Sequence, residues 1–368
     1  MPTKKVVFLQ NLIYPIRNPF FNQLTKVEGI SLKVLFLSET SANRKWRIEK
    51  DKLLYPNKVL KNFKFKINDG DTFEYIINPF SLIDYFREMP DILITIGWAN
   101  ATNYLFMFMN LIRNKPFYIW CESTINEQNK RRSLMMPLIR FFVERSKGII
   151  VPGILSAAYI KQIDKNAKII VVPNSIDNER FYNKRRKGNT NMIKLLYVGR
   201  FEKIKGIDNL LEAFKNLSIK YPNKLELMLV GYGPEESSIK RIIKKYNLNV
   251  KMIPFVEPKE LPLIYKNADI FILPSLREVW GFVINEAIAA GLPIIVSNKV
   301  GSSLDLVING KNGYIFQGGD TLSLQSNLEK LISSPSIRLK MGKFSQKHIL
   351  NFTYEVMLNS FLSNLKFN

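Results

Sequence analysis

Two glutamates, Glu278 and Glu286, stand with seven residues between them in the stretch SLREVWGFVINEAIAAGLPIIVS. Within it, ILPS is typical of a strand end, LREVW of a loop, and Gly281 of a break before a helix that Gly291 ends. This pattern predicts Glu278 in a loop and Glu286 within the following helix. The N-terminus of such a helix presents free backbone N–H groups and positive potential to an anion. A ligand that carries phosphate fits there.

Each glutamate also has a simpler interpretation. Glu286 is compatible with a helix position that faces solvent, although its neighbours Ile284, Ala287 and Ile288 leave few polar positions on that helix. Glu278 is compatible with an ordinary loop acid that pairs with Arg277. The two residues alone do not decide between a ligand site and these alternatives.

A second candidate for chemistry is the stretch YVGRFEKIKG. It places Gly199 and Arg200 directly after a predicted strand, with Lys205 in the loop that follows. Ligands of α/β domains bind beyond the carboxyl ends of the strands. Arg200 can direct two donors at one phosphate and Lys205 can add a point charge. The alternative is a strand-to-helix turn whose basic residues are solvated.

The elements that would position these residues are visible as short apolar runs between polar turns. In the first half they cover 5–10, 32–37, 91–97, 117–121, 148–153 and 168–174. Nearly continuous apolar runs are typical of parallel strands covered on both faces. Amphipathic stretches of helical length, 103–112 and 133–145, lie between several of them. This alternation predicts a doubly wound α/β domain.

The same alternation restarts after the polar and basic stretch YNKRRKGNTN, with strands expected at 193–200, 225–231, 250–255, 268–275 and 292–297. Two similar halves indicate two Rossmann-like domains that face a central cleft. We therefore predict an N-terminal domain over residues 1–175, a linker over 176–192 and a C-terminal domain over 193–350. A final helix over 351–368 can cross back to the first domain.

Composition limits the classes of function. The chain has 368 residues, 46% of them hydrophobic, which suffices for two cores. Its net charge of +23 would attract nucleic acid, anionic lipid or phosphorylated small molecules. Cys121 is the single cysteine and His348 the single histidine, which excludes internal disulfides, histidine triads and multi-histidine metal sites. The N-terminus does not resemble a signal peptide and no apolar run approaches about 18 residues, so we expect a cytoplasmic protein.

Five stretches of the chain together resemble a known family. They are VPNSID (172–177), YVGRFEKIKG (197–206), LVGYGPEE (229–236), the long stretch from Tyr265 to Ser297, and NGKNGYIF (309–316). In this order and spacing they resemble the retaining GT-B glycosyltransferases of the large group 1, or family 4, with the Glu-x7-Glu motif. That family includes sucrose synthase and bacterial enzymes that build cell-surface glycans. The resemblance covers nearly the whole second half.

The resemblance implies a metal-independent enzyme of the hexosyltransferase type, which needs no cofactor and uses a UDP- or GDP-sugar as donor. Glu286 would bind the ribose hydroxyls, because a carboxylate accepts two hydrogen bonds from a cis-diol. Arg200 and Lys205 would stabilise the diphosphate as it leaves. The donor site implied in this way comprises Gly199, Arg200, Lys205, Phe255, Glu278, Gly281, Phe282 and Glu286. Of these, Glu278, Gly281 and Phe282 would address the sugar and its phosphates, and Phe255 lies in the segment expected to contact the base.

The first half resembles the family only loosely. Relatives often carry a glycine-rich first loop and a histidine near the reacting sugar, whereas this chain has QNLIYPIRNPFFNQL and FYIWCEST at those places. Glu122 is therefore the candidate for contacting the acceptor or the oxocarbenium-like centre. Its alternative is a strand-end acid satisfied by a neighbouring helix. Trp98, at another strand end, is either a platform for sugar stacking or a core residue.

Three further stretches are candidates for binding. NDGD (68–71) resembles the Asp-x-Asp metal motif of other glycosyltransferases, but Asn, Asp and Gly between two strand-like segments indicate a turn. The stretches 103–117 and 129–148 combine Arg and Lys with Leu, Met and Phe. Such helices either lie in a membrane interface or are core helices with a charged outer face. Peripheral contact with the inner face of an anionic membrane is thus one expectation, and binding of nucleic acid is not expected.

These observations predict a retaining glycosyltransferase that moves a sugar from a nucleotide diphosphate to a hydroxyl of a glycan or lipid-linked acceptor, for cell-surface polysaccharide or glycolipid biosynthesis. The catalytic candidates are Glu278, Arg200, Lys205 and Glu122. Two alternatives stay open. One is a GT-B sugar-nucleotide epimerase or hydrolase, and the other is a non-catalytic scaffold that binds polyanions or a membrane surface through its positive charge.

Overall fold

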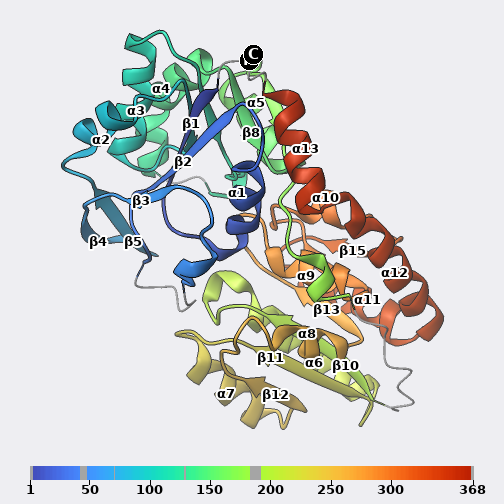
Figure 1. Ribbon diagram of the computed structural model, residues 1–368. Coiled ribbons are helices and arrows are strands. Elements are labelled where there is room, and N and C mark those ends of the chain that lie inside the picture. Colours follow the sequence, from blue (N-terminus) through green and yellow to red (C-terminus); the bar gives the residue numbers. More distant parts are fainter. Residues whose placement is uncertain (1–2, 42–47, 70, 128–129, 183–191, 366–368) are drawn as a thin grey trace.

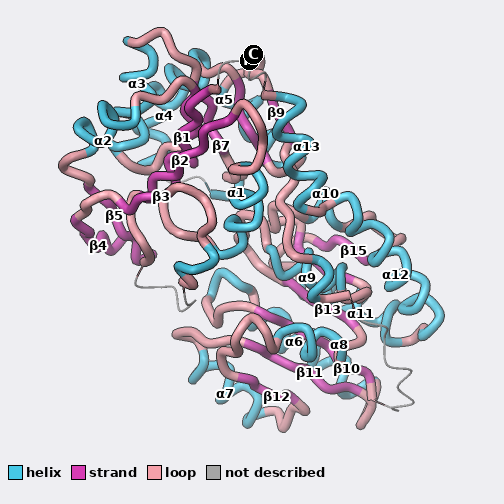
Figure 2. The backbone as a smooth tube through the Cα atoms, in the orientation of Figure 1, coloured by secondary structure: helices cyan, strands magenta, loops and turns pink. Residues whose placement is uncertain are grey.

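The computed structural model describes residues 3–41, 48–69, 71–127, 130–182 and 192–365 and contains two α/β domains (Figure 1). Figure 2 shows their strands as two separate groups, each flanked by helices. The strands predicted from apolar runs are present, with ends that differ by a few residues. Within the described residues, every helix is too short or too polar to cross a membrane.

The N-terminal sheet has seven parallel strands in the order β3-β2-β1-β6-β7-β8-β9. Most of their side chains are buried on both faces, which explains the nearly continuous apolar runs of the sequence. The short edge strand β3 was not predicted. The bounds are β1 (Lys4–Gln10), β2 (Ile30–Phe36), β3 (Asn57–Val59), β6 (Ile92–Ile96), β7 (Phe117–Trp120), β8 (Gly148–Val151) and β9 (Ile169–Val171).

Two layers of helices cover this sheet. One face carries α2 (Ser81–Glu88), α3 (Ala101–Ile112), α4 (Lys130–Arg145) and α5 (Ile154–Ile163), whose buried residues share a core with alternate residues of the strands. The other face carries α1 (Asn18–Leu24) and α13 (Tyr354–Asn364). Short 3-10 helices lie at η1 (Pro15–Arg17), η2 (Lys50–Lys52) and η3 (Ile125–Glu127).

A separate antiparallel hairpin is formed by β4 (Phe63–Asp69) and β5 (Asp71–Ile77). Asp69 pairs with Asp71 across its tip, so NDGD lies at a turn, as its composition predicts. Gly70 lies outside the described residues, as do the side chains of Asn68 and Asp71.

The C-terminal sheet has six parallel strands in the order β12-β11-β10-β13-β14-β15. They are β10 (Ile193–Val198), β11 (Leu225–Val230), β12 (Val250–Ile253), β13 (Ile270–Leu273), β14 (Ile294–Ser297) and β15 (Gly313–Phe316), the last not predicted as a strand. The helices are α6 (Ile207–Lys220), α7 (Glu236–Lys245), α8 (Leu261–Lys266), α9 (Phe282–Ala289), α10 (Ser303–Leu306), α11 (Thr321–Ile332) and α12 (Pro335–His348), with η4 (Asn178–Arg180), η5 (Lys203–Lys205) and η6 (Ile349–Asn351).

The carboxyl edges of the two sheets face each other. Lys299, which follows β14, donates through Nζ to Oδ1 of Asn126, in the loop after β7, at 3.4 Å. The carboxylate of Asp305, on α10, accepts from the backbone N of Ile154 at 3.1 Å, where α5 begins after β8. Burial raises the pKa of Asp305 to about 6, and the Ile154 hydrogen bond opposes this shift. Segments that follow strands of the two sheets therefore meet at this junction.

The end of the chain runs from the C-terminal domain to the N-terminal domain, where α13 packs on the first sheet (Figure 1). The buried ring of Phe361 lies 5.8 Å from Phe8, 5.4 Å from Phe20 and 6.3 Å from Trp120, measured between ring centroids. Tyr354 also donates its hydroxyl to the carbonyl of Ile16 at 2.7 Å. The last helix thus completes the core of the N-terminal domain.

Replacing Phe361 with Ala removes the aromatic ring at the centre of this contact. We expect the substitution to lower the free energy of unfolding of the N-terminal domain by about 3–5 kcal/mol, because a buried Phe→Ala change loses transfer energy and leaves a cavity. Chemical denaturation followed by tryptophan fluorescence measures this loss. Leu350→Ala, at an exposed position, is the control and should change stability little. Equal effects of the two substitutions would contradict a packing role for α13.

Candidate active site

Arg200, Lys205 and Glu278, three of the predicted donor residues, lie in loops at the switch point of the C-terminal sheet. Strands β10 and β13 are neighbours in the sheet but are separated in the chain by β11 and β12. Arg200 follows β10 and Glu278 follows β13. Crevices for ligands form where adjacent parallel strands lead to helices on opposite sides of a sheet. This topology brings together two loops that the sequence separates widely.

Lys205 and Glu278 form the central ion pair of this site. Nζ of Lys205 lies 2.6 Å from Oε2 of Glu278. The loops are joined by backbone as well, because the carbonyl of Ile204 accepts from the N–H of Leu276 at 2.8 Å. Gly206 has φ +67°, and an added Cβ would lie 2.3 Å from the carbonyl oxygen of Pro274. A glycine is therefore required for the close approach that places Lys205 beside Glu278.

The loop that carries Glu278 is held on its other side by the chain after β14. Glu278 pairs with Val300 as an isolated parallel bridge, and its carbonyl accepts from Gly301 N at 3.0 Å. Gly281 then begins α9 with φ +88°, and an added Cβ would lie 3.1 Å from side-chain atoms of Leu273 and Val300. Phe282, the first residue of α9, is partly buried against the domain core. The predicted helix start at Gly281 is confirmed.

Arg200 lies in a turn fixed by the strand before it. The hydroxyl of Tyr197 donates to the Arg200 carbonyl at 2.8 Å, and Gly199 N donates to Val230 O at 3.0 Å. The Arg200 guanidinium is 2.8 Å from the carboxylate of Glu202. An arginine that is already held in position beside an open strand end is suited to receive a phosphate group.

A row of aromatic rings extends from Arg200 toward the sheet edge. The guanidinium of Arg200 lies 5.8 Å from the ring of Tyr232, and this ring packs edge-to-face with Phe255 at 5.8 Å. Phe255 follows β12 and is exposed to solvent. Sequence reasoning singled out Phe255 but missed Tyr232, although Tyr232 lies within the quoted motif LVGYGPEE.

Glu286 is held by a different set of contacts. The hydroxyl of the buried Tyr265 donates to Oε2 of Glu286 at 2.7 Å. Burial raises the pKa of Glu286 to about 7, while the Tyr265 hydrogen bond and the charge of Arg180 oppose this shift. Tyr265 itself is packed between the rings of Phe181 and Phe271. Glu286 is therefore not a solvent-facing helix residue. The sequence did not single out Tyr265, because its partner Glu286 is distant in the chain.

In the N-terminal domain, Glu122 is ion-paired with the buried guanidinium of Arg17. The same guanidinium donates to Oδ1 of Asn174 at 3.0 Å and lies 4.3 Å from the ring centroid of Trp120. Burial lowers the pKa of Arg17 to about 10. This arrangement agrees with the alternative of a strand-end acid satisfied by a neighbouring segment. Contact of Glu122 with an acceptor stays a prediction.

The switch point of the N-terminal sheet lies between β1 and β6. There, Nδ2 of Asn100 donates to Oδ1 of Asn11 at 3.3 Å, which joins the loops that follow these two strands. Trp98 is 8% exposed and belongs to the core on the α2–α5 side of the sheet. Of its two predicted roles, the structure supports that of a core residue.

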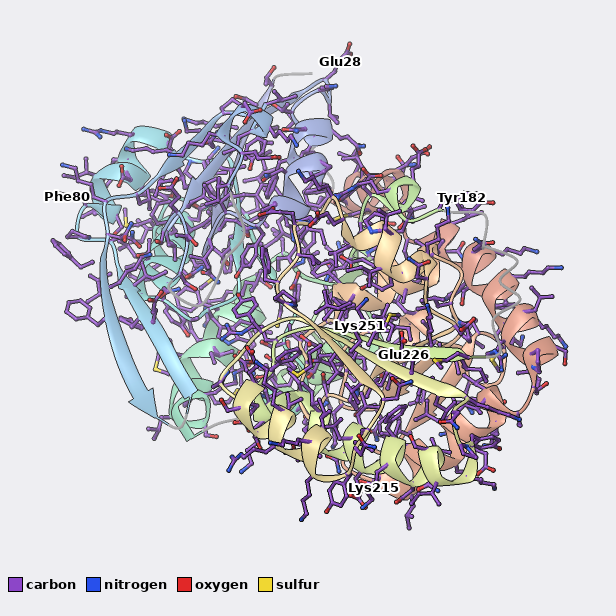
Figure 3. The ribbon with its side chains drawn as sticks, turned by 90° about the horizontal axis from the view of Figure 1, so that it is seen from below. Glu28, Phe80, Tyr182, Lys215, Glu226 and Lys251 are labelled. Atoms are coloured by element: carbon purple, nitrogen blue, oxygen red, sulfur yellow. The ribbon has the colours of Figure 1, made fainter. Side chains whose placement is uncertain are left out.

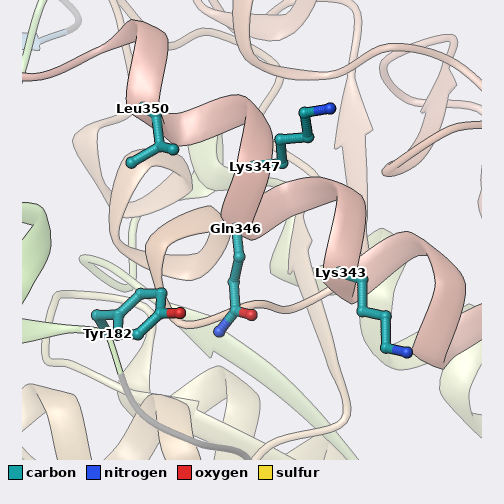
Figure 4. Close-up of a pocket in the computed structure, with 5 residues that line it drawn as sticks. All are labelled: Tyr182, Lys343, Gln346, Lys347 and Leu350. Carbon is teal, nitrogen blue, oxygen red and sulfur yellow. The ribbon is translucent and has the colours of Figure 1, made fainter.

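One pocket lies away from these residues. It has a volume of about 440 Å³ and is lined by Tyr182, Lys343, Gln346, Lys347 and Leu350, mainly from α12 (Figure 4). None of its lining residues belongs to the predicted donor site. Among the side chains that the structure describes, no three or more of His, Cys, Asp and Glu are grouped so that they could hold a metal ion.

Comparison with protein families and curated sequences identifies the second half of the chain. The model of the family described as glycosyl transferases group 1 matches residues 177–348. A capsular polysaccharide biosynthesis glycosyltransferase from Staphylococcus aureus is 33% identical over 180 residues, 48% of this chain and 46% of the relative. D-inositol 3-phosphate glycosyltransferase from Corynebacterium urealyticum is 28% identical over 51% of this chain and 49% of the relative. The matched region thus spans about half the length of these curated relatives.

Solved structures match the chain over nearly its full length. HepE from Anabaena, solved in complex with UDP, superposes with a TM-score of 0.77 at 16% identity and covers 98% of this chain and 100% of that chain. Sucrose-phosphate synthase from Thermosynechococcus elongatus gives a TM-score of 0.73 at 17% identity, with 97% of each chain covered. At these identities the likeness concerns the fold. The chain therefore has the GT-B fold, and residues 177–348, which make up most of its C-terminal domain, match the model of the group 1 glycosyl transferases.

Proposed function

We propose that this protein is a glycosyltransferase that moves a sugar from a nucleotide diphosphate to a hydroxyl of a glycan or lipid-linked acceptor. The observation that carries the proposal is the ion pair of Lys205 with Glu278 in the loop directly before α9. It lies at the switch point of a domain that matches the group 1 model, where Arg200 follows the neighbouring strand β10. A relative named for capsular polysaccharide biosynthesis supports a role in cell-surface polysaccharide or glycolipid synthesis. We place the reaction in the cytoplasm, on the inner face of the membrane.

The donor would lie across the carboxyl edge of the C-terminal sheet. Arg200 and Lys205 bind the diphosphate, and the backbone N–H groups at the start of α9 add donors to it. Glu286 accepts hydrogen bonds from the ribose hydroxyls, which requires its ionised form. Glu278, already paired with Lys205, accepts from a hydroxyl of the transferred sugar. A structural neighbour with bound UDP supports a UDP-sugar as donor, and a GDP-sugar is the alternative.

The reaction proposed is front-face substitution with retention of the anomeric configuration. The bond between the anomeric carbon and the phosphate oxygen breaks, and a bond from the acceptor oxygen forms on the same face. The acceptor proton passes to the departing phosphate oxygen, so that no enzymic nucleophile is needed. Arg200, Lys205 and the N-terminus of α9 stabilise the negative charge that grows on the diphosphate. These groups supply the charge that a metal ion supplies in other glycosyltransferases.

Substitution of Arg200 with Ala or of Glu286 with Gln tests this assignment. We expect each to lower kcat/KM for sugar transfer by at least about 100-fold, because each removes a charge that the transition state or the bound donor requires. Transfer is measured with a radiolabelled sugar nucleotide and the cell-surface glycan fraction as acceptor. Arg241→Ala, at an exposed position on α7, and Glu355→Gln, at an exposed position on α13, are matched controls that should retain activity.

Full activity of both site variants would exclude the proposed donor site. Release of free nucleotide at an equal rate with and without acceptor would instead identify a hydrolase or epimerase. Binding of polyanions that falls steeply with salt, without any turnover, would identify a scaffold, because such binding is driven by counterion release.

The hydrogen bond from Tyr265 to Glu286 predicts a pH dependence of donor binding. Glu286 has a pKa of about 7 and binds the ribose as a carboxylate, so affinity for the donor should rise as pH increases through about 7. The Tyr265 hydroxyl stabilises the carboxylate, so Tyr265→Phe should move this midpoint to higher pH. Calorimetric titration of a sugar nucleotide between pH 5.5 and 8.5 measures the midpoint. Tyr246→Phe, at an exposed position, is the control; an unchanged midpoint in Tyr265→Phe would contradict a positioning role.

Thermal shift with a panel of UDP- and GDP-sugars identifies the donor. A ligand at 100 times its Kd stabilises the folded protein by about 2.7 kcal/mol and raises Tm accordingly. We expect one nucleotide sugar to raise Tm more than its free nucleotide, and Arg200→Ala to abolish that rise. Equal shifts with every phosphorylated compound in the panel would show charge binding without donor selectivity.

A further inference from the structure

Helix α2 buries its polar residues and exposes its apolar ones. Its inner side consists of Ser81, Asp84 and Tyr85. Asp84 pairs with Lys58 at 2.6 Å, and the Tyr85 hydroxyl donates to Oδ1 of Asn110 at 2.7 Å, so these inner groups have partners. On the outer side, Ile83 and Phe86 are 50% and 51% exposed. A helix that packs on a core with its apolar stripe has the opposite arrangement.

The exposed apolar surface continues over the two helices beside α2. Phe108 and Ile112 are exposed on α3, at positions opposite to its core residues. Leu138 and Phe141 are exposed on α4, also away from the core, and Leu134 beside them is 82% exposed. We call this surface the α2–α4 face and define it by Ile83, Phe86, Phe108, Ile112, Leu138 and Phe141.

The three helices form the outer layer on one side of the N-terminal domain (Figure 1). Phe80, directly before α2, lies at the outer edge of this domain, away from the C-terminal domain (Figure 3). A gathering of exposed apolar side chains on the helices of one layer is uncommon on monomeric proteins and marks a contact with a partner or a membrane.

The charges around the α2–α4 face are mainly basic. Among the described side chains of its three helices, the exposed charged residues are Arg87, Arg140 and Arg145 against the single acid Glu144. The guanidinium of Arg145 stacks on the ring of Phe141 at 3.8 Å, and the ammonium of Lys61 lies 5.5 Å from the ring of Phe80. Apolar rings with cations beside them match a layer of acyl chains below anionic headgroups.

We propose that the α2–α4 face docks on an anionic lipid bilayer. A symmetric contact between two copies of this face would gather Arg87, Arg140 and Arg145 of both copies in one interface, where the excess of like charge is repulsive. An anionic lipid surface attracts the same residues and accepts the apolar side chains that project from three helices. The proposal rests on the membrane location given in the proposed function and names the surface responsible, whereas its test does not depend on the donor site. It would place the N-terminal domain at the surface where a lipid-linked acceptor resides.

Co-sedimentation of the full chain with vesicles tests this surface. We expect the protein to bind vesicles of phosphatidylglycerol with phosphatidylcholine, and to bind phosphatidylcholine alone much less. The double variant Ile83→Ser with Phe86→Ser should lower the partition coefficient by at least about tenfold, because binding strength scales with the apolar area inserted. The matched control is Leu322→Ser with Leu339→Ser, two exposed leucines of the C-terminal domain.

Three outcomes would overturn the proposal. In the first, the unaltered chain fails to bind anionic vesicles. In the second, the control variant loses as much binding as the Ile83→Ser with Phe86→Ser variant. In the third, sedimentation velocity shows a dimer of the unaltered chain, and Ile83→Ser with Phe86→Ser dissociates it. The last outcome would assign the face to a second copy of the chain. An unchanged Tm and an unchanged thermal shift with sugar nucleotides would show that the variant is folded and its donor site intact.

Discussion

The donor site depends on one close approach between two backbone segments. The loop after β10 meets the end of β13 where Gly206 lies against the carbonyl of Pro274 and where Ile204 accepts from Leu276. Any side chain at Gly206 would push these segments apart, because its Cβ would meet backbone that cannot move independently. This contact brings Lys205 to Glu278, and therefore sets the distance between the cation proposed to bind the diphosphate and the carboxylate proposed to bind the sugar.

The charged groups of the site already have partners without a ligand. Lys205 is paired with Glu278, Arg200 with Glu202, and Glu286 accepts from Tyr265. Such pairing fixes the positions of the side chains, so that the proposed binding of a diphosphate would require less reorganisation. It also gives Glu286 a pKa close to neutrality, because burial opposes its charge while Tyr265 stabilises it. If Glu286 binds the ribose as proposed, donor binding and protonation of Glu286 are thereby linked.

The two faces of the N-terminal sheet serve different purposes. On one face, Phe361 of the last helix and the rings around it tie the end of the chain to the first domain. On the other face, α2, α3 and α4 pack inward through a shared core and present apolar side chains outward. At the junction with the second domain, Glu122 neutralises the buried Arg17. The charge of Glu122 therefore stabilises the fold, whether or not Glu122 also contacts an acceptor.

The sequence alone determined the alternation of strands and helices, the helix start at Gly281 and the family of the second half, because these depend on local apolar periodicity, turn residues and short motifs. It also singled out Arg200, Lys205, Glu278 and Glu286. Only the tertiary structure decided which residues form pairs: Lys205 with Glu278, Tyr265 with Glu286 and Arg17 with Glu122. It also decided that Trp98 is buried and that α2 turns its apolar side outward. Such contacts join residues that the sheet topology brings together. A local sequence pattern does not predict which distant residue a given side chain will contact.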